Sequence, residues 1–420
     1  MKKLKTFAFC TLLAALAANH TPATAANGPT GDAAPATRNS EPKMYAWEQE
    51  RDAIPSYTDL VLCYGGSHHR TPYRWDKKRF TPFVTYVDEE RLAPYVTYVD
   101  KEGTEHWLFD GFLFLEFQDS SRPDGGKYAY MVGVLRGQGI SAGKQQWKEL
   151  IDYWFGPDNG VNALEEAVGE AAARLGEPAG KRKVVMVMPD PIIYEEYADT
   201  NTSTTYWGEL NGRRLDFAKA SDRIAAYKWY IDSVRRLFDE ADYRYVELAG
   251  FYIVSEDLAT PGDGWNPELK RWEEVIPEVA EYLHALNESL CWIPYNRAAG
   301  YRNWKRFGID YAYMQPNYFW DDKGEKPLSR FFSDIKANDL AMEFEFDDAL
   351  LEKTAGSEVY RRRLREYMDG AKEHGIYGRK PLAYYHGQNT LYELSVSAAA
   401  EDRKLYHEFC RFVLDNPLRK

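Results

Sequence analysis

Short apolar runs without helical spacing recur along the chain, and two of them end on acidic residues. Residues 250–257 are apolar, β-branched or aromatic up to Glu256 and Asp257, which is typical of a strand covered on both faces. Alternation along this run places Glu256 on the same face as Tyr252, at the carboxyl end of the strand. Residues 340–347 have the same character, with three acids spaced two apart on one face. If both strands belong to one parallel barrel, their carboxylates meet at its mouth.

Such runs alternate regularly with helical segments over most of the chain. Eight runs are predicted to be strands, at residues 59–66, 111–117, 183–189, 246–256, 290–295, 311–317, 340–346 and 381–387. Helices are expected at residues 144–155, 161–175, 221–241 (with Ser221 as the cap), 267–288, 301–307, 329–337, 358–374 and 392–414. Eight strands, each followed by a helix or an insertion, predict an α/β domain of the (β/α)8 TIM-barrel class. A doubly wound open sheet is the alternative, but Gly65 and Gly66 lack the spacing of a dinucleotide-binding loop.

The connection after the first strand is predicted to be an insertion at about residues 67–107. Within it, residues 83–88 and 95–100 nearly repeat each other, and the second copy turns at residues 101–103 into residues 104–109. This pattern predicts a β-hairpin with a short β element before it. Two copies are too few for a repeat architecture, so the insertion decorates the barrel.

The amino-terminal end has the pattern of a secretory signal peptide. Three lysines precede an apolar run and then a stretch of small residues, and the apolar run is too short to span a membrane. We therefore expect residues 1–25 to be a signal peptide and residues 26–43, which have little apolar content, to be a flexible linker. Residues 44–420 are predicted to be a single barrel domain, exported to the periplasm, the cell surface or the medium.

The chain is acidic, which limits its partners. Its formal net charge is −12 at pH 7, and removal of residues 1–25, which hold three lysines and no acid, moves the balance to about −15. Nucleic acid is therefore not expected as a partner, whereas a neutral carbohydrate is compatible with this charge. No later segment reaches transmembrane length. Cys63, Cys291 and Cys410 are scattered and are expected to be small buried residues. The oligomeric state is left open.

Reactive groups of a TIM barrel gather at the carboxyl ends of its strands, and here those ends are rich in carboxylates. Glycoside hydrolysis needs two, because one protonates the departing oxygen while the other stabilises or attacks the anomeric carbon. Glu256 is the candidate general acid/base and Glu345 the candidate nucleophile, although Glu343 and Asp347 share its face and compete for that role. Glu343 lies deeper, where an unpaired charge is costly, so it is expected to have a partner or to be protonated.

Other side chains at the strand ends suit the recognition of a sugar. Asn and Gln bind hydroxyl groups, and aromatic rings stack on the apolar faces of sugar rings. The candidate substrate-binding residues are Glu343, Gln315, Asn317, Trp320, Asn296, Glu116, His386 and Tyr64. No metal and no cofactor are expected, since the sequence has no His-x-His pair, no metalloprotease helix motif and no nucleophile elbow.

In these residues the chain resembles domain-of-unknown-function family 4855, a group of exported bacterial proteins among the glycoside-hydrolase-like TIM barrels. The resemblance covers nearly all of residues 45–415. It rests on residues 109–113, 188–191, 250–252 with Glu256, 315–319 and 342–345. It implies a barrel with a site at these strand ends and supplies no activity.

A second resemblance is to retaining glycosidases whose acid/base ends strand four and whose nucleophile ends strand seven. Glu256 and Glu345 fall on those strands. Those enzymes usually carry Asn directly before the acid, and this chain has Ser255 there. Asn296 or Asn317 would therefore have to contact the 2-hydroxyl group of the sugar.

These observations predict an exported hydrolase that cleaves glycosidic bonds of an oligo- or polysaccharide by a retaining mechanism. Retention requires carboxyl groups about 5 to 5.5 Å apart and inversion about 6.5 to 9.5 Å, and an acid that works near neutrality needs a raised pKa. The alternative is a non-catalytic carbohydrate-binding barrel, favoured if the carboxylates lie beyond about 12 Å or if the insertion plugs the mouth. A metal-dependent hydrolase would need three converging ligands, which the sequence does not show.

Overall fold

The computed structural model describes most of the predicted barrel domain. The residues it describes are 56–65, 83–84, 91–92, 95–120, 122, 124–157, 159–193, 206–258, 269–387 and 390–419. The chain divides into two compact units, residues 1–51 and 52–420, and every element below belongs to the second. The predicted signal peptide and linker lie outside the described residues, as does much of the predicted insertion.

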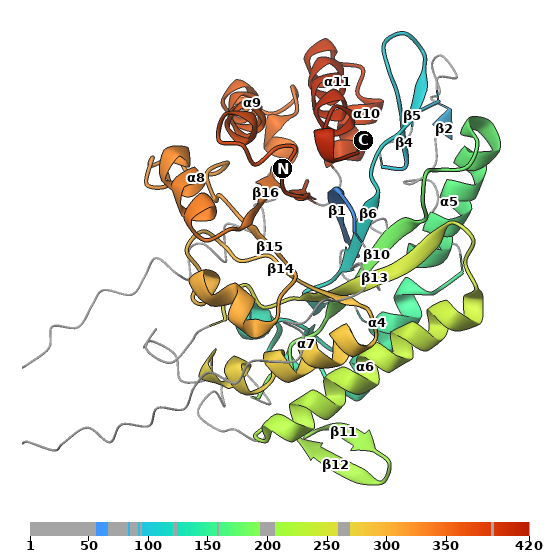
Figure 1. Cartoon of the computed structure of the whole chain (residues 1–420), viewed down its shortest axis with the longest axis vertical. Coiled ribbons are helices and arrows are strands. Elements are labelled where there is room, and N and C mark those ends of the chain that lie inside the picture. Colours follow the sequence, from blue (N-terminus) through green and yellow to red (C-terminus); the bar gives the residue numbers. More distant parts are fainter. Residues whose placement is uncertain are drawn as a thin grey trace, which may run out of the picture. The chain divides into compact units, whose positions relative to one another are not determined.

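Eight parallel strands close into a barrel, as predicted (Figure 1). Their order around the ring is β1 (Asp59–Tyr64), β17 (Leu382–Tyr385), β16 (Ala341–Glu345), β15 (Tyr311–Met314), β14 (Ser289–Trp292), β13 (Val246–Ile253), β10 (Arg182–Met188) and β6 (Gly111–Leu115). Each strand pairs in parallel with both of its neighbours. The β6 and β16 strands are buried along their whole length, which explains why the strands read as apolar runs.

Helices cover the outside of the ring (Figure 1). They are α4 (Lys144–Trp154), α5 (Gly160–Leu175), α6 (Ala220–Ala241), α7 (Ile276–Ala285), α8 (Leu328–Ala337), α9 (Ser357–Glu373), α10 (Thr390–Val396) and α11 (Ala400–Leu414), with 3-10 turns at Leu269–Glu274, Tyr301–Phe307 and Asp348–Leu350. Each longer helix buries one apolar stripe against the strands, as Leu164, Ala167, Val168 and Ala171 of α5 show. The order of strands and helices expected from the sequence is therefore the order found in the fold.

Two helix predictions need correction. Ser221 is not a cap, because α6 begins at Ala220 and Lys219 occupies the N-cap position. The predicted helix at residues 392–414 is two helices, α10 and α11. Ser397 lies between them, accepts a hydrogen bond from Ala399 N at 3.2 Å and donates one to Asp402 at 2.8 Å. These local bonds replace the helical ladder at that point.

The amino-terminal end of the barrel is tied to the end of the chain. Asp59, at the start of β1, accepts hydrogen bonds from Tyr384 Oη at 2.7 Å and from Arg419 Nη1 at 2.9 Å. Burial raises the pKa of Asp59 to about 7, although the charge of Arg419 opposes the shift. Because this end is filled by structural contacts, a site is expected at the opposite, carboxyl end.

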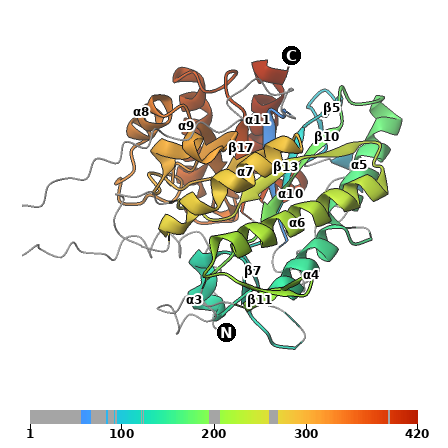
Figure 2. The same cartoon turned by 60° about the horizontal axis from the view of Figure 1, so that its bottom comes forward.

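Short hairpins decorate the barrel. The predicted hairpin is confirmed as β4 (Thr97–Val99) and β5 (Glu105–Trp107), and the short β element before it as β2 (Phe83–Val84) with β3 (Arg91–Leu92). A further hairpin, β11 (Tyr206–Leu210) with β12 (Arg213–Asp216), was not predicted. It lies beside α4 (Figure 2), where Lys144 Nζ donates to Glu209 O at 2.6 Å.

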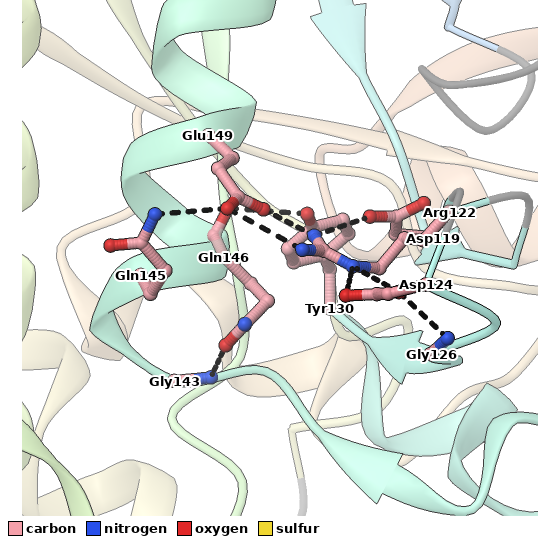
Figure 3. Close-up of polar contacts among 9 residues, drawn as sticks. All are labelled: Asp119, Arg122, Asp124, Gly126, Tyr130, Gly143, Gln145, Gln146 and Glu149. Atoms are coloured by element: carbon pink, nitrogen blue, oxygen red, sulfur yellow. Dashed lines mark hydrogen bonds and ion pairs between the residues drawn. The ribbon is translucent and has the colours of Figure 1, made fainter.

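The connection from β6 to α4 is fixed by one arginine (Figure 3). This connection holds β7 (Gln118–Asp119), β8 (Tyr128–Ala129) and β9 (Ile140–Ser141). Arg122 donates to Asp119 and Asp124, at 3.2 Å each, and also to Glu149 of α4. Three carboxylates around one guanidinium fasten the segment after β6 to the first helix of the barrel.

Gly250 offers a test of strand packing inside the ring. A Cβ atom at this position would lie 2.1 Å from Ser289 Oγ and 2.3 Å from Ser289 O on the neighbouring strand. We expect Gly250→Ala to lower the free energy of unfolding by about 3 kcal/mol or more, because the backbone of β14 has to move. Urea denaturation measures the loss. Gly180→Ala is the control, since nothing lies within 4 Å of its added Cβ, and equal stability of the two variants would contradict the packing argument.

Candidate active site

Glu256 and Glu345 are joined by a chain of hydrogen bonds through two amide side chains. Gln315 Nε2 donates to Glu256 Oε1 at 2.8 Å, Asn317 Nδ2 donates to Gln315 Oε1 at 3.3 Å, and the same Nδ2 donates to Glu345 Oε1 at 3.1 Å. Glu256 follows β13, the two amides follow β15, and Glu345 ends β16. Three strand ends of the ring thus bring these four predicted residues into one network.

The irregular backbone at Asn317 positions Glu345. Asn317 has a φ of 51°, in the left-handed region that Asn adopts more readily than most residues. Its backbone N–H donates to Glu345 Oε2 at 2.5 Å, while its side chain donates to the other oxygen. Asn296 supports this turn, since its N–H donates to Asn317 Oδ1 at 2.9 Å and its Nδ2 donates to Pro316 O at 2.8 Å. Asn296, which follows β14, therefore stabilises the turn from which Asn317 reaches Glu345.

Burial raises the pKa values of both carboxyl groups. The pKa of the half-buried Glu256 rises to about 7, against the opposing hydrogen bond from Gln315. The pKa of Glu345, which is 3% exposed, rises to about 8, against the N–H of Asn317 and the charge of Lys326. A site with these values exchanges protons near neutral pH, which general acid/base chemistry requires.

Glu343 lies beneath this pair. It is 2% exposed, and its Oε1 has no hydrogen-bond partner among the described residues. Burial, followed by the charges of Glu345 and Glu256, raises its pKa well above the ordinary value. These causes favour the protonated form of Glu343, one of the two states expected from its depth in the strand.

Aromatic rings occupy the neighbouring part of the mouth. The ring of Trp320 lies 6.1 Å from that of Tyr385, and the ring of Tyr385 lies 5.5 Å from that of Tyr64. All three side chains are half-buried. Tyr385 is also the register partner of Glu345 across β16 and β17. The mouth thus has a polar arc from β13 to β16 and, beside it, an aromatic arc formed by Trp320 after β15, Tyr385 of β17 and Tyr64 of β1.

Asp347 holds the ring of Trp320 in the aromatic arc. It accepts a hydrogen bond from Trp320 Nε1 at 2.9 Å and caps the following 3-10 turn by accepting from Ala349 N at 2.9 Å. Both of its oxygens are thus engaged by N–H groups. Of the three acids on this face of β16, Glu345 is the one that joins the network with Glu256.

Two other predicted residues are not brought to this network. Glu116 is buried after β6 and accepts a hydrogen bond from Phe117 N at 3.0 Å. His386 is fully buried, with its ring 5.4 Å from Tyr95 and 6.4 Å from Phe346. Strand alternation explains the placement of His386, since the preceding residue on β17 is the one beside Glu345.

Three residues near the network were missed by the sequence analysis. Tyr385 directly precedes His386, so the period of two, counted from the strand end, would have found it. Tyr295 directly precedes Asn296 and bonds Asp257. Lys326, whose charge acts on Glu345, follows β15 in a loop that no strand pattern could align with the site.

Metal ligands and membrane spans are absent from the described part of the chain. Within these ranges no three His, Cys, Asp or Glu side chains converge closely enough to hold a metal ion. Cys63, Cys291 and Cys410 are buried, and no disulfide joins any two of these three residues. Among the helices described, none has the length and apolar content needed to cross a membrane.

Comparisons with known proteins identify a family and distant structural likenesses. A family model described as "Domain of unknown function (DUF4855)" matches residues 88–411. The catalytic domain of a family GH18 chitinase from the fern Peteris ryukyuensis is similar with a TM-score of 0.38 and 11% identity, over 84% of this chain and 99% of that chain. A Cellulomonas fimi endo-beta-1,4-mannanase double mutant is similar with a TM-score of 0.39 and 13% identity, over 86% of this chain and 71% of that chain. No curated protein matches the sequence.

The raised pKa values predict how stability depends on pH. The pKa of Asp190 is raised to about 8 by burial, and those of Glu345 and Asp59 to about 8 and about 7. Between the ordinary carboxyl pKa near 4 and these values, the folded chain binds more protons than the unfolded chain, so stability falls as pH rises. We expect the free energy of unfolding to drop by roughly a few kcal/mol from about pH 5 to about pH 8, measured by urea denaturation.

Asp190→Asn separates this effect from general charge repulsion. The variant cannot ionise at residue 190, so its stability should fall less steeply over the same pH range. The exposed Asp369→Asn makes the same change in net charge and should keep the wild-type slope. A stability that rises from pH 5 to pH 8 in the wild type would refute the assignment of raised pKa values.

Proposed function

The chain belongs to the domain-of-unknown-function family DUF4855, and from the geometry of its site we propose that it is a glycoside hydrolase. In this proposal Glu256 is the general acid/base and Glu345 is the nucleophile of a retaining mechanism. The observation that carries the proposal is the hydrogen-bonded chain from Glu256 through Gln315 and Asn317 to Glu345. It holds two carboxyl groups from distant strands in one network.

The surroundings of the two acids support different roles. Glu256 is half-buried and accepts a hydrogen bond from one neutral amide, so it retains its proton up to about pH 7 and remains accessible to a leaving group. Glu345 accepts two N–H groups from Asn317, one on each oxygen. Such donors favour the ionised form that a nucleophile requires. Burial still holds the pKa of Glu345 at about 8, so the ionised nucleophile is the minor form at neutral pH.

The proposed reaction proceeds in two steps. Glu345 attacks the anomeric carbon and forms a glycosyl ester, while Glu256 gives its proton to the departing oxygen. Glu256, now ionised, takes a proton from water as that water attacks the anomeric carbon and releases Glu345. Protons and bonds balance over the two steps, and the net reaction consumes one water.

The aromatic arc supports a carbohydrate as the substrate. Trp320, Tyr385 and Tyr64 are half-buried beside Glu345, and such rings present apolar faces to the C–H groups of a sugar. Trp320 is held by Asp347, which limits rotation of the ring. The signal-peptide pattern of residues 1–25 supports export, so we further propose that the substrate is an oligo- or polysaccharide outside the cytoplasm.

Substitution of the two acids tests the proposed roles. Against a panel of aryl glycosides and polysaccharides, Glu345→Gln should lose all measurable cleavage. Glu256→Gln should lose about 10²- to 10⁴-fold on polysaccharides and much less on aryl glycosides, whose phenolate leaves without a proton. Glu278→Gln, an exposed change on α7, is the control and should match the wild type.

The stereochemistry of the first product completes this test. A retaining mechanism releases the same anomer as the substrate, which proton NMR detects before mutarotation. Full activity in Glu345→Gln, or inversion at the anomeric carbon, would exclude the nucleophile assignment. Glycan binding without cleavage by the wild type would instead favour the non-catalytic carbohydrate-binding barrel.

The pKa values of the pair predict the pH profile of the reaction. Catalysis needs one proton on the pair, and burial sets the two pKa values at about 7 and about 8. We therefore expect kcat/KM to peak between these values, rising from acid pH and falling in alkali. Gln315→Leu removes the hydrogen bond that lowers the pKa of Glu256, so the limb of the profile near pH 7 should move to higher pH. An optimum near pH 5 would contradict the proposed pair.

A further inference from the structure

Glu343 is a third acid that the proposed reaction does not use. It is 2% exposed, two residues before Glu345 on the same face of β16, and its Oε1 has no hydrogen-bond partner in the described part of the chain. Glu345 and then Glu256 are the charged groups that act on it. Its carboxyl group therefore lies beside the catalytic pair, with an oxygen that is buried and unpaired.

The three carboxyl groups have little positive charge to balance them. No described Lys, Arg or His forms an ion pair with Glu256, Glu343 or Glu345, and the charge of Lys326 acts on Glu345 from the loop after β15. A neutral sugar would leave the three acids without a positive charge beside them. A cationic group would stabilise the ionised form of each neighbouring carboxyl group.

Geometry limits the kind of cation. Within the described residues no three acidic, imidazole or thiol side chains converge closely enough for one metal ion. An ammonium group offers three N–H donors and can bind the unpaired oxygen of Glu343 without the set of converging ligands that a metal ion needs. The aromatic arc of Trp320, Tyr385 and Tyr64 also favours a cation, since ring faces attract positive charge.

The charge of the whole chain is consistent with such a ligand. A formal net charge of −12 attracts cationic molecules and repels anionic ones over distances comparable to the Debye length. A glycan that carries free amino groups would be drawn to the protein, whereas a sulfated or uronic-acid glycan would be repelled.

We propose that this site binds a sugar with a free amino group, and that Glu343 receives the ammonium group beneath Glu256 and Glu345. The inference rests on the proposed function for its substrate class, a carbohydrate, and adds the charge of that substrate. On binding, the ammonium group donates a hydrogen bond to the unpaired oxygen of Glu343. The carboxyl group of Glu343 releases its proton to solvent, which leaves an ion pair in place of a buried neutral acid.

Matched monosaccharides test this without knowledge of the linkage. Glucosamine, N-acetylglucosamine and glucose differ only at C2, and galactosamine and galactose repeat the comparison in a second ring. By ligand-observed NMR at about pH 7 and low salt, we expect the free amines to bind at least about tenfold more tightly than their neutral counterparts. The preference should shrink at about 0.5 M NaCl, because salt screens the attraction.

Glu343→Gln is the matched variant, since it removes the charge and keeps the shape. It should reduce the preference for amines to about twofold or less, measured in that variant as the ratio of the affinity for each amine to the affinity for its neutral counterpart. Glu278→Gln, with the same loss of charge on the surface, should keep the full preference. If Glu343→Gln does not fold, the wild type is tested instead. Calorimetry in buffers of different ionisation enthalpy then measures how many protons are released when each sugar binds. Amine binding should release about one proton and glucose binding none.

The outcomes separate this inference from the hydrolase proposal. Equal binding of amines and neutral sugars, absence of binding by both, or a preference that survives in Glu343→Gln would overturn the inference. Cleavage of neutral aryl glycosides without any preference for amines would leave the hydrolase standing and the inference refuted. Preferential amine binding without cleavage of any glycoside would support the inference and refute the hydrolase.

Discussion

Closure of the eight-stranded ring is the constraint on which the site depends. Glu256 and Glu345 lie far apart in the sequence, and only the parallel order β13, β14, β15, β16 brings the ends of their strands to one mouth. Each of these strands is hydrogen-bonded on both sides, so its end has little freedom to move. Gly250 shows how closely the ring is packed, since even one added carbon would overlap Ser289. The scaffold therefore fixes the acids before any loop contributes.

Within that frame, the segment after β15 joins the two acids. Gln315 reaches Glu256, and Asn317 reaches Glu345 through both its backbone and its side chain. A regular strand could not offer the backbone N–H in this direction, because its N–H groups lie in the plane of the sheet. The left-handed turn at Asn317 redirects it. A locally unfavourable conformation is thus retained where it orients the carboxyl group of Glu345, and such conformations are common at functional sites.

The barrel was predictable because each strand is a run of residues suited to burial on both faces, and the same runs placed Glu256 and Glu345 at one mouth. Other features depend on contacts that a sequence pattern does not encode. The helix at residues 392–414 is broken by the local bonds of Ser397, and Lys326 acts on Glu345 from an irregular loop. The β11–β12 hairpin did have a sequence signal, Asn211 followed by Gly212, both with positive φ, which is typical of a two-residue turn. His386 was selected instead of Tyr385 because a one-residue error in a strand exchanges its two faces.

Buried acids at the two ends of the barrel differ in their hydrogen-bond partners, and this difference is consistent with a site at the carboxyl end. At the amino-terminal end, Asp59 accepts hydrogen bonds from Tyr384 and Arg419, so each of its oxygens has a partner within the fold. At the carboxyl end, Glu343 keeps an unpaired oxygen beside two further acids. An uncompensated buried acid lowers stability near neutral pH, and the chain shows elsewhere that it can supply a partner. Glu256 and Glu345 accept hydrogen bonds from Gln315 and Asn317, so of these three acids it is Glu343 that keeps an oxygen without a partner. In the proposal made above, the partner of that oxygen is a ligand that enters at the mouth.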